Sequence, residues 1–168
     1  MHSSIYLGVL IVMPIVGAFV AMMTRKQQDV SYYVAVVTAT LELAMSIVVA
    51  VLYNNHLTGE GTYDFLSRHV VSAPLGLAYD VGVDGISLFM VVLTALVLFL
   101  SLLGARERRR EASFVGWLLL LTSFTMASFV SHDVLEFFIF FELTLVPSYF
   151  IIANWGGVQR ARAALKFF

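Results

Sequence analysis

Two carboxyl groups stand inside long apolar stretches, where an ionisable side chain is expensive. Glu142 lies near the middle of the run FFIFFELTLVPSYF, and Glu42 lies in ATLELAMSIV. A charge at the centre of a membrane helix costs about 2.5 to 3.5 kcal/mol on insertion scales, so such a residue faces a partner or a water-filled cavity. Burial of Glu142 among aromatic and aliphatic neighbours would disfavour its charged form and let it take up and release protons.

Pro147 strengthens the proton-transfer hypothesis for Glu142. Proline has no amide hydrogen, so in a continuous helix the carbonyl of Leu143 loses its usual donor and the helix tends to kink. A free carbonyl beside a carboxyl is a suitable anchor for water, which proton transfer through a membrane requires. The alternative is a static ion pair between Glu142 and another helix, with Pro147 as a packing kink. The default for ionisable residues at membrane depth favours the functional hypothesis.

Two further acids receive structural interpretations. Glu42 has no proline or strong polar group beside it, so an interhelical hydrogen bond is its favoured role. Asp84, in DVGVDGISLF, precedes an apolar run at a position where an acid caps a helix N-terminus. The cap is favoured over a catalytic role for Asp84.

Other patterns exclude several kinds of chemistry. Ser131, His132 and Asp133 are the residue types of a hydrolase triad, but adjacent residues in a short turn cannot face one another as nucleophile, base and orienter. The chain has no cysteine, which excludes disulfides and thiolate metal sites. The four histidines lie outside the apolar runs and lack metal-ligand spacing: His2, His56, His69 and His132. No metal site is expected.

The composition predicts the elements that must position these groups. Hydrophobic residues make up 60% of the 168 residues and charged residues 12%, against about 25% charged in an average soluble domain. With a net charge of −1 there is no sign of a nucleic-acid partner. A membrane helix needs about 20 apolar residues. The sequence predicts one all-α transmembrane helix bundle over 1–168, with spans at about 5–23, 31–53, 82–104, 113–131 and 134–153.

The connections between the spans predict the orientation. Nine of the ten lysine and arginine residues fall on one side of the expected membrane, and only Arg68 falls on the other. The positive-inside rule therefore predicts an N-terminus outside the cytoplasm. The first span is expected to be retained. Gly59, Gly61 and Pro74 separate apolar stretches in the loop 54–80, which is expected to fold back on the outer surface as a short hairpin. Residues 161–168 are expected to begin a sixth helix.

Three stretches resemble one protein family. GVDGISLF at 82–89, DVLEFFIFFELTLVPSYFIIANWGG at 133–157 and RARAALKFF at 160–168 are similar to the subunit 4, or chain M, antiporter-like subunits of respiratory complex I. The resemblance covers about half of the chain, in order. Composition and periodicity alone indicate only a polytopic membrane protein.

The resemblance implies a membrane-arm subunit of proton-translocating NADH:quinone oxidoreductase. It implies no redox cofactor in this chain, since partner subunits bind NADH, FMN, iron–sulfur clusters and quinone. Glu142 matches the family's key acid, which pairs with a lysine of a later helix, and Asp84 and Lys166 match recurrent family positions. The implied partners are other membrane subunits, especially neighbouring antiporter-like ones, and the implied location is the bacterial inner membrane.

The sequence also departs from the family pattern. Thr122 stands where many relatives have a second acid, and Glu136 stands where an apolar residue is usual. Relatives have about fourteen helices, so this chain is expected to be a fragment or one part of a split subunit. Two alternatives stay open: a subunit of a multisubunit cation/proton antiporter or membrane-bound hydrogenase, and a purely structural membrane scaffold.

Overall fold

The computed structural model describes residues 3–56, 64–72, 77–104 and 111–168. Six helices and two strands occur there, and they are α1 (Ser3–Met23), α2 (Gln28–His56), β1 (Asp64–Ser72), β2 (Leu77–Val83), α3 (Gly85–Gly104), α4 (Ala112–Val130), α5 (Val134–Trp155) and α6 (Arg160–Phe167). Helices α1 to α5 are long and apolar enough to cross a membrane. The prediction of an all-α bundle with five spans is confirmed. The possible turn residues Gly59, Gly61 and Pro74 and the basic run 106–110 lie outside the described residues.

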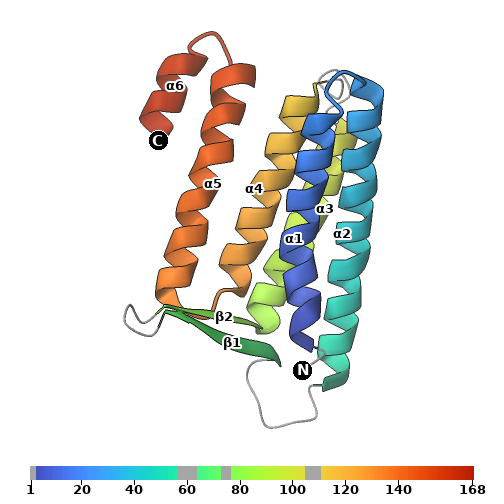
Figure 1. The fold of residues 1–168 in the computed structure, drawn as a ribbon, viewed down its shortest axis with the longest axis vertical. Helices are drawn as coiled ribbons and strands as arrows, with labels where there is room; N and C mark the ends of the chain where they lie inside the picture. The colour runs from blue at the N-terminus through green and yellow to red at the C-terminus, as the bar shows by residue number, and fades with distance from the viewer. Residues whose placement is uncertain (1–2, 57–63, 73–76, 105–110) are drawn as a thin grey trace.

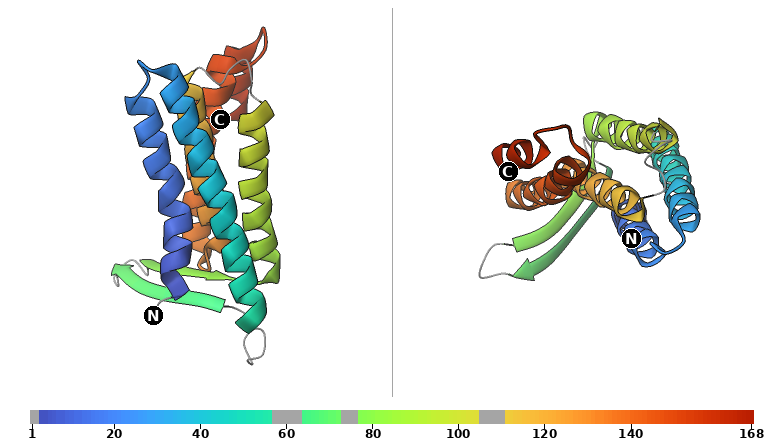
Figure 2. Two further views of the ribbon diagram at one scale, coloured as in Figure 1. Left: turned by 90° about the vertical axis from the view of Figure 1, so that its right-hand side faces the viewer. Right: turned by 90° about the horizontal axis from the view of Figure 1, so that it is seen from above.

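Helices α1 to α4 form a bundle, and α5 and α6 lie to one side of it against α4 (Figures 1 and 2). In the view along the helices, α2 lies between α1 and α3, and α4 lies between α1 and α5. Because α5 packs mainly on α4 and on the short α6, it is the least buried of the five long helices.

A β-hairpin covers the end of the bundle where the N-terminus lies (Figure 1). Strands β1 and β2 pair antiparallel, with Arg68 opposite Asp80 and His69 opposite Tyr79. The short hairpin expected within the 54–80 loop is therefore confirmed. Its bounds are corrected at both ends, because α2 continues to His56 and β2 runs to Val83. The third span consequently begins at Gly85 rather than at residue 82.

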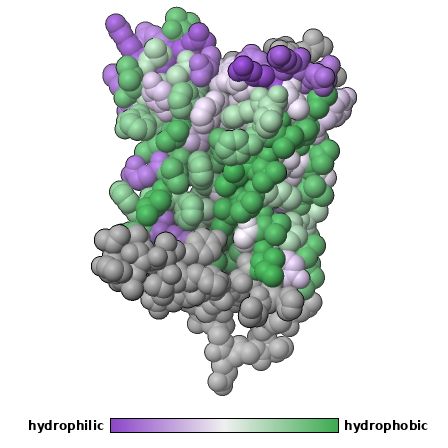
Figure 3. All heavy atoms as spheres, in the orientation of Figure 1, coloured by the Kyte–Doolittle hydropathy of each residue, from purple (hydrophilic) through white to green (hydrophobic). Residues whose placement is uncertain are grey.

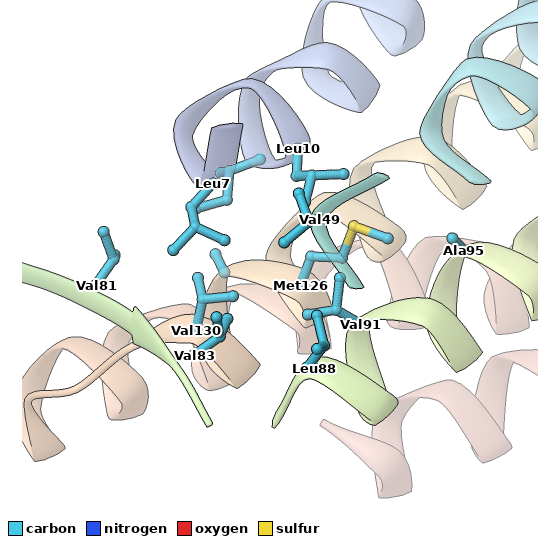
Figure 4. Packing of buried hydrophobic residues seen from close by; sticks show 12 residues of the cluster. Leu7, Leu10, Val49, Val81, Val83, Leu88, Val91, Ala95, Met126 and Val130 are labelled. Atoms are coloured by element: carbon cyan, nitrogen blue, oxygen red, sulfur yellow. The ribbon is translucent and has the colours of Figure 1, made fainter. Parts of the chain in front are cut away.

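Two apolar clusters fill the interior of the bundle, one toward each end. The cluster at the hairpin end, most of which Figure 4 labels, contains Leu7, Leu10, Ile11, Val49, Val81, Val83, Leu88, Val91, Ala95, Met126, Ala127 and Val130. The cluster at the opposite end contains Ala18, Ala21, Ala35, Ala39, Leu98, Leu102, Val115 and Leu119. Four alanines in the second cluster permit close helix approach, as is common between membrane helices.

The surface matches a membrane environment. Large apolar side chains are exposed along α1, α2, α3 and α5, and hydrophobic residues dominate the middle of the molecule in Figure 3. Hydrophilic residues gather at the end opposite the hairpin, where Arg25, Lys26, Arg160, Arg162 and Lys166 lie on or beside the ends of α1, α5 and α6. The basic connections among the described residues thus lie at one end, as the sequence predicts.

Candidate functional site

Helix α5 carries the principal candidate acid and begins with a side-chain cap. Asp133 Oδ1 accepts hydrogen bonds from the amides of Leu135 (2.8 Å) and Glu136 (3.3 Å). These bonds satisfy amide groups that lack partners in the first turn of any helix. At the other end, Gly156 is the C-cap and its amide donates to the carbonyl of Ile152. The helix is therefore held at defined residues on both sides of Glu142.

Glu142 lies on an exposed face of α5. The expectation that its aromatic and aliphatic neighbours bury this carboxyl is wrong for this chain. The neighbours Phe138 and Phe141 are exposed as well, because α5 packs mainly on α4 and otherwise has only the short α6 and β2 as substantial neighbours among the described elements. No hydrogen bond or ion pair of Glu142 occurs among the described residues. Any group that pairs with this carboxyl must come from elsewhere.

Pro147 lies inside α5, five residues after Glu142, and is buried. The carbonyl of Leu143 therefore has no helical donor, as the sequence analysis predicts. The side chains around it already serve the backbone: Thr144 Oγ1 donates to the carbonyl of Phe141 (2.6 Å), and Ser148 Oγ donates to that of Thr144 (2.8 Å). Glu142 thus lies beside a weakened turn of α5 that has free acceptor capacity.

Lys166 lies on α6, which folds back beside α5 (Figure 1). The helix begins at Arg160, one residue before the predicted start. Tyr149 of α5 contacts Phe168 edge to face at 5.9 Å, and Arg160 Nη1 donates to the carbonyl of Asn154 (2.6 Å). Lys166 itself is exposed, and in the described part of the chain it forms no ion pair with Glu142. The two groups are on neighbouring helices but are not brought together.

Glu42 is the opposite case, because it is fully buried. Its exposed fraction is 0%, and neither carboxyl oxygen has a hydrogen-bond partner among the described residues. The expected interhelical hydrogen bond is therefore wrong. The sequence shows the acid in its apolar run but cannot show which face of α2 turns inward.

Asp84 caps α3, as predicted. Its Oδ1 accepts hydrogen bonds from the amides of Ser87 (2.7 Å) and Ile86 (3.1 Å), and its own amide donates to Ser87 Oγ (2.9 Å). The backbone hydrogen bond from Ser87 is the main reason that the pKa of Asp84 lies below its usual value, because it favours the charged form. Asp84 positions the start of α3 and has a structural role here.

Glu136 has a role that its place in the sequence did not predict. Its Oε2 accepts a hydrogen bond from the backbone amide of Asp80 in β2 (3.0 Å), and the carbonyl of Asp80 accepts one from the amide of His132 (2.7 Å). Val81 also forms a β-bridge with Ser131. The hairpin is therefore attached to the α4–α5 turn, directly at the start of the helix that carries Glu142. The D-x-x-E pattern at 133–136 is typical of a capping box, but that pattern predicts a bond from Glu136 to the amide of its own N-cap residue and not to the hairpin.

The turn of Ser131, His132 and Asp133 serves this attachment and not a hydrolase triad. Its groups act separately: Ser131 Oγ donates to the carbonyl of Ala127 (2.7 Å), and Asp133 caps α5. Among the described residues there is also no group of three or more histidine and acidic side chains placed to hold a metal ion.

Comparisons with known proteins identify the family. Residues 131–168 match the family described as "NADH:quinone oxidoreductase/Mrp antiporter, TM". NADH-quinone oxidoreductase subunit M of Rickettsia prowazekii is 35% identical over 146 residues, which are 86% of this chain and 29% of the relative. The F(420)H(2) dehydrogenase subunit M of Methanosarcina mazei is 34% identical and matches 96% of this chain and 32% of its own length. The chain thus spans about a third of these relatives.

Solved structures have the same fold. A chain of respiratory complex I from Thermus thermophilus with bound NADH superposes with a TM-score of 0.75 at 27% identity, over 94% of this chain and 31% of its own. An archaeal membrane-bound sulfane sulfur reductase superposes with a TM-score of 0.76 over 96% of this chain and 33% of its own, but at 16% identity it supports the fold alone. The chain belongs to the family of antiporter-like membrane subunits that includes subunit M of NADH-quinone oxidoreductase.

Proposed function

We propose that this chain contributes to proton translocation as part of the membrane arm of an NADH:quinone oxidoreductase. Glu142 is its proton-handling residue, and Pro147 supplies the free backbone acceptor beside it. Electron transfer takes place in partner subunits, which hold NADH, FMN, iron–sulfur clusters and quinone. Neighbouring antiporter-like subunits are the immediate partners in the bilayer.

The observation that carries this proposal is the position of Glu142. It is an ionisable group at membrane depth, on a helix face that the described residues leave uncovered, and none of those residues neutralises it. A charge in that position is costly unless a cation or water reaches it. A carboxyl that depends on a partner from outside the chain can change its protonation when that partner moves.

The basic end of the bundle supports the orientation that we propose. Arg25, Lys26, Arg160, Arg162 and Lys166 lie at the end opposite the hairpin. The positive-inside rule places that end in the cytoplasm, so the hairpin and the N-terminus lie outside the bacterial inner membrane.

A second candidate function differs only in the electron donor. The relative from Methanosarcina mazei is a subunit of an F(420)H(2) dehydrogenase and matches nearly the whole of this chain. The same proton-handling part would then work in a complex with another source of electrons. The proteins that copurify with the chain distinguish the two, because flavin and iron–sulfur subunits with NADH activity support the first.

The test is Glu142→Gln in membrane vesicles of the source organism, with assembly checked on native gels. The control is Glu111→Gln, which makes the same change in an exposed acid at the start of α4, outside the span. We expect both variants to assemble and only Glu142→Gln to lose NADH-driven proton pumping. Unchanged pumping in an assembled Glu142→Gln complex would show that this acid is structural.

A further inference from the structure

Glu42 of α2 is a buried acid that the proposed function does not use. It lies fourteen residues after Gln28 and fourteen before His56, at the midpoint of α2. At a rise of 1.5 Å per residue it is about 21 Å from either end of the helix. The carboxyl is therefore at the centre of the membrane span, with an exposed fraction of 0%.

No counter-charge faces Glu42 from the helices that pack against α2. Those helices are α1, α3 and α4, and none of them contains Asp, Glu, Lys, Arg or His. The one titratable side chain on them is Tyr6 of α1, near the hairpin end. On α2 itself the charged and titratable groups lie near the ends: Asp29, Tyr32, Tyr33, Tyr53 and His56. A carboxylate at Glu42 would be an unpaired buried charge, so the neutral acid is the favoured form.

Other polar groups lie at the same level of the bundle as Glu42. In α2, Glu42 and Ser46 separate Ala39 of one apolar cluster from Val49 of the other. In α4, Thr122 and Ser123 similarly separate Leu119 from Met126. We call these four residues the polar layer: Glu42, Ser46, Thr122 and Ser123. All four have exposed fractions of 7% or less.

Helix α1 contains a proline at this level. Pro14 is buried between Ile11 of one cluster and Ala18 of the other. Because proline lacks an amide hydrogen, the carbonyl of Leu10 loses its helical donor. Ser123 Oγ of α4 donates to the adjacent carbonyl of Ile11 at 2.6 Å. The layer thus contains free backbone acceptor capacity as well as hydroxyl groups.

The hydroxyls near Glu42 can accept a hydrogen bond. Thr38 Oγ1 donates to the carbonyl of Val34, and Ser46 Oγ donates to that of Leu43, each at 2.8 Å. A hydroxyl that donates one hydrogen bond still has lone pairs, whereas a protonated carboxyl has one hydrogen to donate. One such acceptor lies a helical turn before Glu42 and one lies a turn after it, on the same buried face of α2.

We propose that Glu42 is a proton-binding site inside the α1–α4 bundle, separate from Glu142, which exchanges its proton with water through the polar layer. The bound ligand is a single proton, and no other reactant is required. The proton is held as the O–H of the neutral acid and leaves to water, so that a carboxylate remains for a short time. This site is independent of electron transfer and of the partner subunits.

Infrared spectroscopy of the chain in lipid nanodiscs tests the proposal directly. We expect a carbonyl-stretch band of a protonated carboxyl at neutral pH that Glu42→Gln removes and Glu142→Gln leaves in place. Transfer to D₂O should shift the band, and strongly alkaline buffer should convert it to carboxylate absorption. Glu42→Asp, which keeps a carboxyl, should retain a shifted band, and circular dichroism checks the folding of each variant.

Two results would overturn the proposal. One is that Glu42→Gln keeps every protonated-carboxyl band of the unmodified chain and Glu42→Asp shows no shifted band. The other is that the band is lost in Glu42→Gln but does not respond to D₂O or alkali in the unmodified chain, which would make Glu42 a static neutral acid. The measurement requires no NADH or quinone, so its result stands whether or not Glu142→Gln abolishes pumping.

Discussion

Replacement of Glu136 by leucine should detach the hairpin locally from the start of α5. The bond between Glu136 Oε2 and the amide of Asp80 is 3.0 Å long and partly buried. A leucine side chain cannot accept this hydrogen bond, and loss of the acceptor of a partly buried amide costs about 1 to 3 kcal/mol of stability. If this entire cost lowers the free energy of local opening, hydrogen exchange at the Asp80 amide accelerates by about 5- to 150-fold.

The global effect of Glu136→Leu should be smaller than the local one. Glu136 Oε1 is buried without a partner among the described residues, so leucine also removes an unsatisfied polar atom. Hydrogen exchange with mass spectrometry on a peptide that covers 77–83 provides the measurement. Glu136→Gln is the control, because its amide oxygen still accepts the bond and its exchange should remain near that of the unmodified chain. Unchanged exchange at Asp80 in Glu136→Leu would refute the attachment.

Three further predictions concern the packing that holds the acids in place. A Cβ added at Gly17 would lie 2.6 Å from Thr38 Oγ1, whereas a Cβ added at Gly8 would meet nothing within 4 Å. Gly17→Ala should therefore lower the unfolding free energy in detergent by about 1 to 3 kcal/mol, and Gly8→Ala should leave it unchanged. Ser123→Ala removes a buried interhelical donor, which should cost about 0.6 kcal/mol in the same assay. Asp84→Ala should lower the unfolding free energy by about 1 kcal/mol, because it removes the helix cap. The pKa of Asp84 is lowered in the folded state, so the cap contributes fully above about pH 4, and its contribution declines as the pH falls through the folded-state pKa. An acid titration of stability checks this pH dependence.

Local patterns in the chain were sufficient for most of the fold. Five apolar runs of membrane length predict five spans, because a helix must satisfy its backbone within the bilayer, and each predicted run overlaps one of α1 to α5. The cap at Asp84 was predictable because its partners lie two and three residues away. The hairpin was predictable in outline from the glycines and proline between its apolar stretches. The missing amide donor at Pro147 was predictable because proline acts on its own helix.

The surroundings of the acids depended on contacts between distant segments. Glu42 and Glu142 both stand in apolar runs, yet α2 turns its acid into the bundle and α5 turns its acid outward. An apolar run that is hydrophobic on all sides has no periodicity that marks its inner face, so helix rotation is set by the packing of neighbours. The bond from the Asp80 amide to Glu136 joins residues 56 positions apart, and the bond from Ser123 to Ile11 joins residues 112 apart. Such pairings form only when the helices assemble, and for that reason they were absent from the sequence-based expectations.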